Sequence, residues 1–145
     1  MEITCGIYLY STEIDRVLVG HVTNQNAWSI PKGHYEDTDK SYFACANREL
    51  WEETNISLSD LNILEKHEFD FTMYKSNKKK IKTFLIVTDT PIETMDIKCN
   101  SYFQDKNNVR IPEFDTYKWI KVDSLRNYVH YAQHQNVEKI KNLIY

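Results

Sequence analysis

Three glutamates lie at positions where their carboxylates could act together on one reaction. Glu49, Glu52 and Glu53 come soon after Arg48, and residues three and four positions apart share one face of a helix. Like charges on adjacent turns destabilise a helix, so this cluster favours the binding of a compensating cation. Carboxylate oxygens are hard ligands that suit Mg²⁺, with Mn²⁺ as a substitute.

This spacing indicates a metal site of the kind that cleaves a pyrophosphate bond. Magnesium prefers a few carboxylates together with waters and phosphate oxygens, which is what cleavage of a pyrophosphate bond requires. Arg48 is expected to orient a neighbouring carboxylate through bidentate hydrogen bonds. The alternative is an ordinary solvated acidic helix face, and the surrounding residues favour the metal site over that alternative.

A longer motif surrounds the three glutamates. Residues 33–56 resemble the box of the Nudix hydrolase family, G-x5-E-x7-R-E-U-x-E-E-x-G-U, where U is a bulky aliphatic residue. Residues 28–34, Trp-Ser-Ile-Pro-Lys-Gly-His, resemble the common lead-in to that box. The second half of the box matches in register at Arg48, Glu49, Leu50, Glu52, Glu53 and Ile56.

The first half of the box departs from the pattern. The distance from Gly33 to Arg48 is one residue longer than in the family, so counting does not assign the acid in the middle of the box. Asp39 is the nearest candidate, and Glu36 and Asp37 remain open as alternatives. The extra residue is expected to lie in the loop before the helix.

The resemblance implies roles for individual residues. In this family, the residues that match Glu49 and Glu53 bind metal, and the residue that matches Glu52 binds metal or helps to activate water. Backbone carbonyls at the Lys32-Gly33 turn often join them. The implied reaction is substitution at phosphorus by a metal-activated water, with a glutamate accepting the proton.

A later acid is a candidate for an additional ligand or base. Many relatives use a carboxylate about six residues before a tryptophan, and Glu113 stands in that relation to Trp119. Asp115 is its closest rival. A single glutamate at a set distance fits a solvated loop acid equally well.

The substrate is predicted from looser similarity. Over most of its length the chain resembles the asymmetric diadenosine tetraphosphate hydrolases, which implies that Lys32, His34 and Lys82 hold phosphates. Tyr74 and Tyr117 would then stack on a base, although ordinary strand positions are the alternative for each ring.

The expected substrate is diadenosine tetraphosphate or a related dinucleoside polyphosphate. ADP-ribose, a capped RNA 5′ end and an inositol pyrophosphate are alternatives within the family. A non-catalytic nucleotide-binding module is the alternative outside it, and such a module would be expected to have lost some of the box acids.

Two further groups of residues have simpler explanations. Five lysines could reach a longer polyanion but more often form a solvated hairpin tip, namely Lys75, Lys78, Lys79, Lys80 and Lys82. His130 and His134 have a spacing that suits metal, but no carboxylate signature accompanies them and they are assigned no chemistry.

The elements that must position these residues follow from hydrophobic periodicity. Residues 3–9 and 16–22 predict an antiparallel strand pair, and residues 65–74 and 82–88 predict a long hairpin. A three-to-four residue period predicts a helix from about 41 to 54, closed by Asn55 in the left-handed conformation. Residues 92–112 are expected to be mostly loop. Residues 117–122 predict a strand, and residues 123–144 predict a helix with a break near 132–136.

The Nudix resemblance implies an α/β/α sandwich in which a mixed sheet is flanked by helices and a loop-helix-loop presents the metal site. We expect a single domain over residues 1–145. The net charge of -3 gives no basic field that would indicate a nucleic-acid or membrane partner. The sequence has no segment typical of a signal peptide or membrane span, and its three cysteines show no metal or disulfide pattern. We therefore expect a cytoplasmic monomer or homodimer that acts on a small nucleotide.

Overall fold

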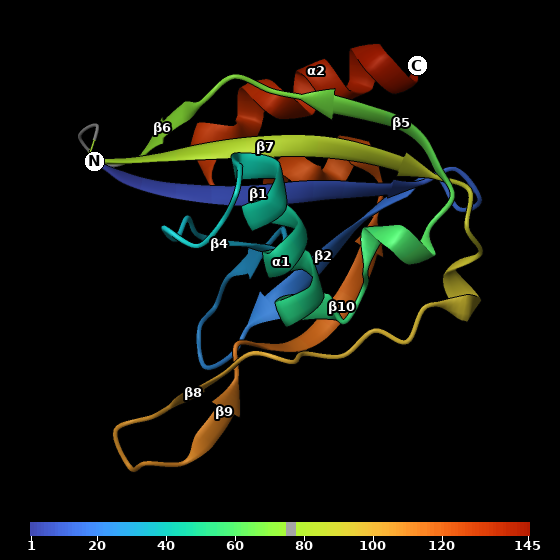
Figure 1. Ribbon diagram of the computed structural model, residues 1–145. Helices are drawn as coiled ribbons and strands as arrows, with labels where there is room; N and C mark the ends of the chain where they lie inside the picture. Colours follow the sequence, from blue (N-terminus) through green and yellow to red (C-terminus); the bar gives the residue numbers. More distant parts are fainter. Residues whose placement is uncertain (75–77) are drawn as a thin grey trace.

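A mixed sheet forms the centre of the protein, and helices cover both of its faces (Figure 1). The computed structural model describes residues 1–74 and 78–145. The strand order along the sheet is β10-β2-β1-β7-β5, and β1 and β7 are parallel while the other pairs are antiparallel. The strands are β1 (Glu2–Ser11), β2 (Arg16–Val22), β3 (Trp28–Ser29), β4 (Lys32–His34), β5 (Ile63–Glu68), β6 (Thr72–Tyr74), β7 (Lys79–Thr88), β8 (Tyr102–Gln104), β9 (Arg110–Pro112) and β10 (Phe114–Ile120).

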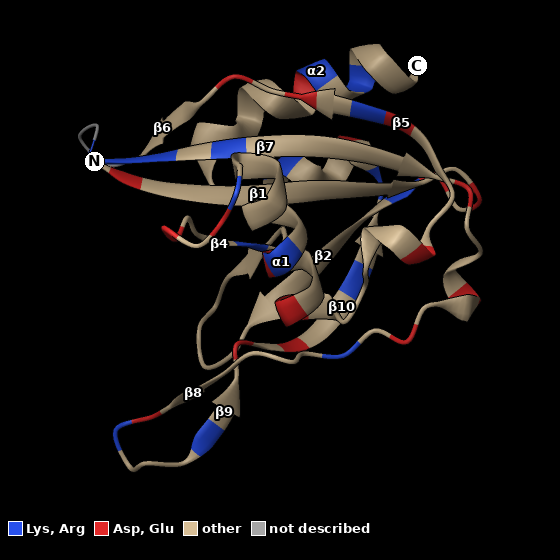
Figure 2. Ribbon diagram, in the orientation of Figure 1, with Lys and Arg blue, Asp and Glu red and all other residues tan. Residues whose placement is uncertain are grey.

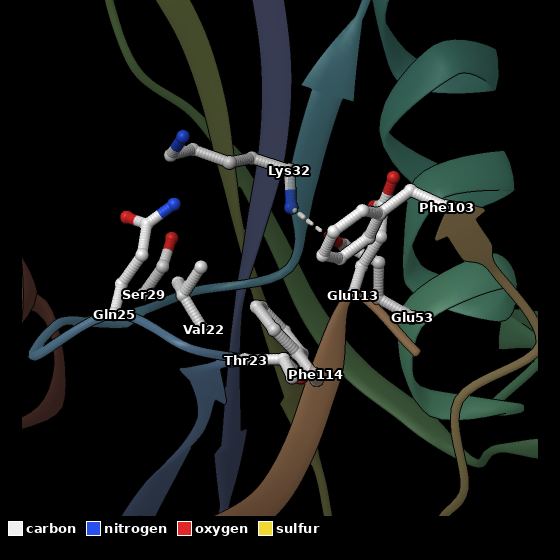
Figure 3. Close-up of a pocket in the computed structure, with 9 residues that line it drawn as sticks. All are labelled: Val22, Thr23, Gln25, Ser29, Lys32, Glu53, Phe103, Glu113 and Phe114. Carbon is white, nitrogen blue, oxygen red and sulfur yellow. Dashed lines mark hydrogen bonds between the residues drawn. The ribbon is translucent and has the colours of Figure 1, made fainter. Parts of the chain in front are cut away.

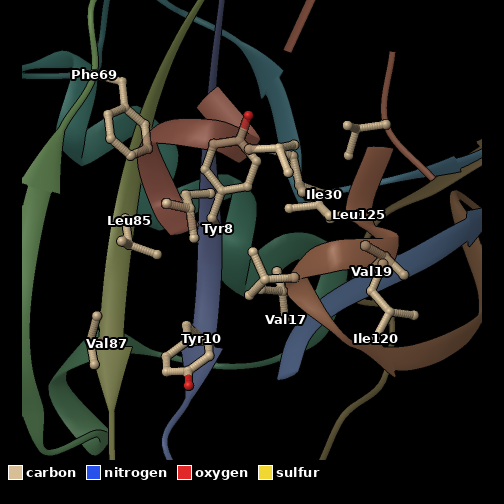
Figure 4. Close-up of a cluster of buried hydrophobic side chains, with 14 residues drawn as sticks. Tyr8, Tyr10, Val17, Val19, Ile30, Phe69, Leu85, Val87, Ile120 and Leu125 are labelled. Atoms are coloured by element: carbon tan, nitrogen blue, oxygen red, sulfur yellow. The ribbon is translucent and has the colours of Figure 1, made fainter. Parts of the chain in front are cut away.

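Two hydrophobic clusters fill the space on either side of the sheet. Alternate side chains of a strand point to opposite faces, so Ile7 and Leu9 of β1 pack beneath helix α1 (Tyr42–Thr54), with Leu50. Tyr8 packs on the other face, with Ile140 of helix α2 (His134–Ile144) (Figure 4). Because both faces are covered, β1 is buried along most of its length. The predicted α/β/α sandwich is confirmed.

Strand β4 explains how the box is attached to the sheet. The second half of β1 pairs with β2, whereas its first half pairs with β4, with Cys5 opposite Gly33. Gly33 therefore lies within a strand and not in the Lys32-Gly33 turn that the resemblance implied, since the bend of the chain is at Pro31. Helix α1 packs against β1, β4 and β7, so the box helix and its lead-in rest on the same part of the sheet.

The caps of α1 agree with the sequence. The Ser41 hydroxyl accepts a hydrogen bond from the Ala44 amide at 3.0 Å, which satisfies one of the free amides of the first turn. Asn55 has φ 64° and its amide donates to the Trp51 carbonyl at 2.8 Å. This is the left-handed cap that we expected in place of glycine.

Other boundaries differ from the prediction. Lys79 and Lys80 belong to β7 rather than to the link before it, while Lys75 lies outside the described residues. The segment expected to be loop contains a short two-stranded arm, β8 and β9, which projects away from the sheet (Figure 1). We expected a helix over residues 123–144 with a break near 132–136, but two 3-10 segments, Val122–Asn127 and Tyr131–Gln133, precede α2. Within the described residues, the other 3-10 segments are Leu58–Asp60 and Ile92–Thr94. Of the helices in residues 1–74 and 78–145, none has both the length and the apolar character needed to cross a membrane.

Candidate active site

Arg48 connects the box acids to one another. Its Nε and Nη2 atoms each donate to Asp39, at 2.9 Å, in a bidentate pair. Its Nη1 atom donates to Glu49 at 2.8 Å and to Glu52 at 3.2 Å, and Nη2 also donates to the His34 carbonyl at 2.9 Å. Charge-assisted bidentate bonds fix both position and orientation. Arg48 is therefore a positioning residue.

The structure distinguishes the three candidates for the mid-box acid. Asp39 has a side chain that is only 6% exposed and forms the bidentate pair with Arg48. Hydrogen bonds from Arg48 lower the pKa of Asp39 to about 2. Glu36 and Asp37 are exposed, and the nearest Glu36 oxygen lies 3.9 Å from Arg48. Of the three acids, Asp39 is therefore the one that forms a bidentate pair with Arg48.

Glu49 and Glu53 are buried carboxylates, and the charge of Glu49 acts on Glu53. They are 7% and 4% exposed. Burial, and then the charge of Glu52, raises the pKa of Glu49 to about 7. Burial, and then the charge of Glu49, raises the pKa of Glu53 well above its usual range. Such a pair disfavours its own ionisation, so a cation between the two carboxylates would stabilise them.

Close approach of the backbone holds these carboxylates in place. A Cβ atom on Gly33 would lie 2.1 Å from Cδ of Glu49, so only glycine leaves room for that carboxylate. The Lys32 amide donates to Glu53 Oε1 at 2.8 Å (Figure 3). Strand β4 therefore contacts both acids of α1, through the Lys32 amide and through the close approach of Gly33. Metal binding by the backbone carbonyls of Lys32 and Gly33 stays a prediction.

The chemistry of this donor set fits a divalent cation. It offers hard carboxylate oxygens beside backbone carbonyls, and two of the carboxylates are buried with raised pKa values. Among the described residues, however, no three His, Cys, Asp or Glu side chains converge on one point. Glu49 and Glu52 are instead both hydrogen-bonded to Nη1 of Arg48.

A cavity of ≈ 640 Å³, here called the acid cavity, contains most of the predicted residues. Figure 2 shows acidic residues on α1, and basic residues in β4 and at the start of β7. The acid cavity is lined by Thr4, Gln25, Lys32, Gly33, His34, Glu36, Arg48, Glu49, Glu52, Lys79, Ser101 and Glu113.

Glu113 lies beside the box acids, whereas its rival does not. It lines the acid cavity, and its charge raises the pKa values of Glu49 and Glu53. Its amide donates to the Ser101 carbonyl at 2.9 Å. Asp115 instead pairs with His21 at 2.8 Å, outside the acid cavity.

Two smaller cavities adjoin the acid cavity and share Gln25 and Lys32 with it. The first, of ≈ 320 Å³, is here called the tyrosine lobe and is lined by Val22, Gln25, Ala27, Trp28, Ser29, Lys32, Tyr74, Lys79, His130 and Gln133. The second, of ≈ 360 Å³, is here called the phenylalanine lobe and is lined by Val22, Thr23, Gln25, Ser29, Lys32, Glu53, Phe103, Glu113 and Phe114 (Figure 3). Half-buried Lys32 lies where all three cavities meet.

A chain of hydrogen bonds fixes the wall of the tyrosine lobe. Gln133 Nε2 donates to the Tyr74 hydroxyl at 2.7 Å, and Gln133 Oε1 accepts from the Tyr8 hydroxyl at 2.7 Å. The His130 ring lies 4.5 Å from the ring of Tyr74, and Tyr131 lies 4.3 Å beyond it. We did not predict Gln133 or His130 as site residues.

Two predicted substrate contacts are absent from the described cavities around the acids. Lys82 does not line any of the three; its ammonium pairs with Glu68 at 2.8 Å. Tyr117 also lies outside them, and its hydroxyl donates to the Glu53 carbonyl. Lys79, three residues before Lys82 in β7, lines the acid cavity together with Lys32. Residues 79 and 82 point to opposite faces of the strand, so Lys82 does not share the face from which Lys79 reaches the cavity.

Comparisons with known proteins agree with this geometry. A family model for the NUDIX domain matches residues 2–140. The chain is 32% identical over 127 residues to a 17.7 kDa protein from the e-segB intergenic region of enterobacteria phage T4, covering 81% of each chain. The fold is similar to an Ap4A hydrolase from C. elegans, in a binary complex, with a TM-score of 0.75 and 19% identity over 97% of both chains. It is also similar to a bifunctional NMN adenylyltransferase/ADP-ribose pyrophosphatase from Francisella tularensis complexed with AMP and a manganese ion, with a TM-score of 0.66 and 19% identity over 96% of this chain and 40% of the other.

Proposed function

The chain belongs to the Nudix family, and we propose that this hydrolase cleaves a pyrophosphate bond in a dinucleoside polyphosphate, with diadenosine tetraphosphate as the first substrate to test. The observation that carries the proposal is the junction of three cavities at Lys32. A polyphosphate chain would occupy the acid cavity, and a base would occupy the tyrosine lobe. Both lobes reach the size of small-ligand pockets, which begin at about 300 Å³.

Cations and aromatic rings are distributed as such a substrate requires. Lys32, His34 and Lys79 line the acid cavity. The two lysines supply the positive groups that phosphates need, and His34 offers a ring nitrogen for a hydrogen bond. Burial, and then the charge of Lys79, lowers the pKa of Lys32, so an anionic substrate would stabilise both ammonium groups. Tyr74 offers a fixed ring on which a base can stack.

The residues of the box then have distinct tasks. A divalent cation, Mg²⁺ or Mn²⁺, would be held by Glu49, Glu52 and Glu53 with the carbonyls of Lys32 and Gly33, and would neutralise phosphate charge and make a bound water more acidic. Arg48 holds Glu49 and Glu52 in orientation. Glu53 or Glu113 accepts the proton from the attacking water.

The experiment that tests this function is a substrate panel. We expect purified protein with Mg²⁺ to convert diadenosine tetraphosphate to ATP and AMP, measured by anion-exchange chromatography. ADP-ribose, nucleoside triphosphates, capped RNA and an inositol pyrophosphate are assayed beside it. Preferred cleavage of another compound would retain the family chemistry and overturn the substrate. If no compound were cleaved in a metal-dependent way, a binding module would be favoured.

A second expected outcome concerns Glu113. Glu113→Gln should lower kcat/KM by about 100-fold, because it removes a carboxylate beside Glu49 and Glu53. Asp115→Asn is the matched control, two residues away; it removes only a partly exposed pair with His21 and should change kcat/KM by less than about twofold. Full activity of Glu113→Gln, or equal losses in both variants, would reject the assignment.

A further inference from the structure

The phenylalanine lobe has a fixed aromatic floor. Phe114 is 4% exposed and lies directly on strand β2, where a Cβ atom on Gly20 would come within 2.2 Å of its ring. Its ring also meets that of Tyr117 edge to face at 6.0 Å. A glycine at residue 20 is therefore what lets this ring lie flat against the sheet.

The second ring of the lobe comes from the projecting arm. Phe103 lies in β8, opposite Ile111 of β9, and is 39% exposed. Its neighbour Tyr102 is similarly exposed at 43% but lines a different cavity on the other face of the arm. An exposed aromatic side chain in the wall of a cavity beside an active site indicates a ligand contact rather than a core position.

The polar groups of the lobe suit the edge of a neutral ring. The Thr23 side chain is buried, with 8% exposure of the residue, and its Oγ1 atom has no hydrogen-bond partner among the described residues. Gln25 and Ser29 add an amide and a hydroxyl. Glu53 and Glu113 lie at the junction with the acid cavity, so a second anionic group is disfavoured in this lobe.

We propose that the phenylalanine lobe is a second nucleobase site, in which the base beyond the polyphosphate chain stacks between Phe103 and Phe114. This inference rests on the proposed function, because it assumes that the first base takes the tyrosine lobe. Phe114 and Phe103 bind the two faces of the base. Thr23 and Gln25 line the same lobe and contact the edge of the base. The β8-β9 arm thereby selects substrates with a base at each end.

Binding measured without turnover tests the inference. In a Glu53→Gln background, calorimetry gives the Kd of diadenosine tetraphosphate and of adenosine tetraphosphate, which has the same phosphate chain and one base. We expect the dinucleotide to bind about tenfold more tightly, since stacking of one base contributes on that scale. Phe103→Ala should remove this difference, whereas Tyr102→Ala, on the opposite face of the same strand, should preserve it.

The possible results separate this inference from the proposed function. Equal affinity for the two ligands with Phe103 present, or equal weakening of both by Phe103→Ala, would overturn the second base site. Failure of the chain with an intact Glu53 to cleave diadenosine tetraphosphate would overturn the proposed substrate alone. Circular dichroism of the Phe103→Ala and Tyr102→Ala variants tests whether these substitutions in the β8-β9 arm leave the fold intact.

Discussion

Glu53→Gln is expected to reduce turnover by about two to four orders of magnitude while leaving the fold unchanged. The substitution keeps the size of the side chain, and its amide oxygen can still accept the hydrogen bond that the Lys32 amide now gives to Oε1 at 2.8 Å. What is lost is a carboxylate that can bind metal and accept a proton. The measurement is kcat with the best substrate of the panel.

Stability is the second measurement on this variant. Burial and the charge of Glu49 raise the pKa of Glu53, so removing the carboxyl relieves an unfavourable interaction and the Tm should stay equal or rise. Glu93→Gln is the control, because Glu93 is an exposed acid in a 3-10 segment and should leave both kcat and Tm unchanged. Full activity of Glu53→Gln would reject the site assignment, because the glutamine keeps the hydrogen bond with the Lys32 amide but lacks the carboxylate that the mechanism needs.

The sequence predicted the parts of the site that depend on local spacing. Glu49, Glu52 and Glu53 share a helix face because of the helical repeat alone, and α1 ends at Asn55, the left-handed cap that the sequence predicted. These features need no knowledge of the rest of the chain. The structure of the lead-in, residues 28–34, was harder to predict, because β4 pairs with β1, a segment far away in sequence.

Residues whose position depends on strand register were predicted less well. Lys79 and Lys82 lie in one polar run, and only the register of β7 decides which of them lines the acid cavity. The resemblance assigned Tyr117 to a base, whereas β10 places its hydroxyl against the Glu53 carbonyl of α1. The position of each side chain follows from the register of its strand, which local sequence does not reveal.

Phe103 carries no local signal of its own. It lies in a three-residue strand of an arm that is rich in Asn, Asp and Lys. Such a strand is too short to show a hydrophobic period. The mid-box acid illustrates the same limit. Three acids were compatible with the loop, and only the tertiary contact between Asp39 and Arg48 distinguishes them.

That contact carries the second large expected effect. Arg48→Met should lower the free energy of unfolding by about 3 kcal/mol, because it leaves the nearly buried Asp39 carboxylate without its charged partner and with the Glu36 amide as a neutral donor. The matched control is Arg126→Met, which breaks a 3.6 Å pair with Glu138 at the surface and should cost about 1 kcal/mol or less. Denaturant unfolding at pH 7 measures both variants.

The pH dependence identifies the charge that is responsible. Arg48 lowers the pKa of Asp39 from 3.8 to about 2, so its stabilising contribution is fully present above the unfolded value and is lost as the pH falls through the folded value. The stability difference between the native chain and Arg48→Met should therefore shrink as the pH falls from about 4 to about 2. Asp39→Asn in the Arg48→Met background should recover part of the loss at pH 7, because it removes the unpaired carboxylate. If the double variant were no more stable than Arg48→Met, then Arg48 would stabilise α1 through Glu49 and Glu52 and not through the mid-box acid.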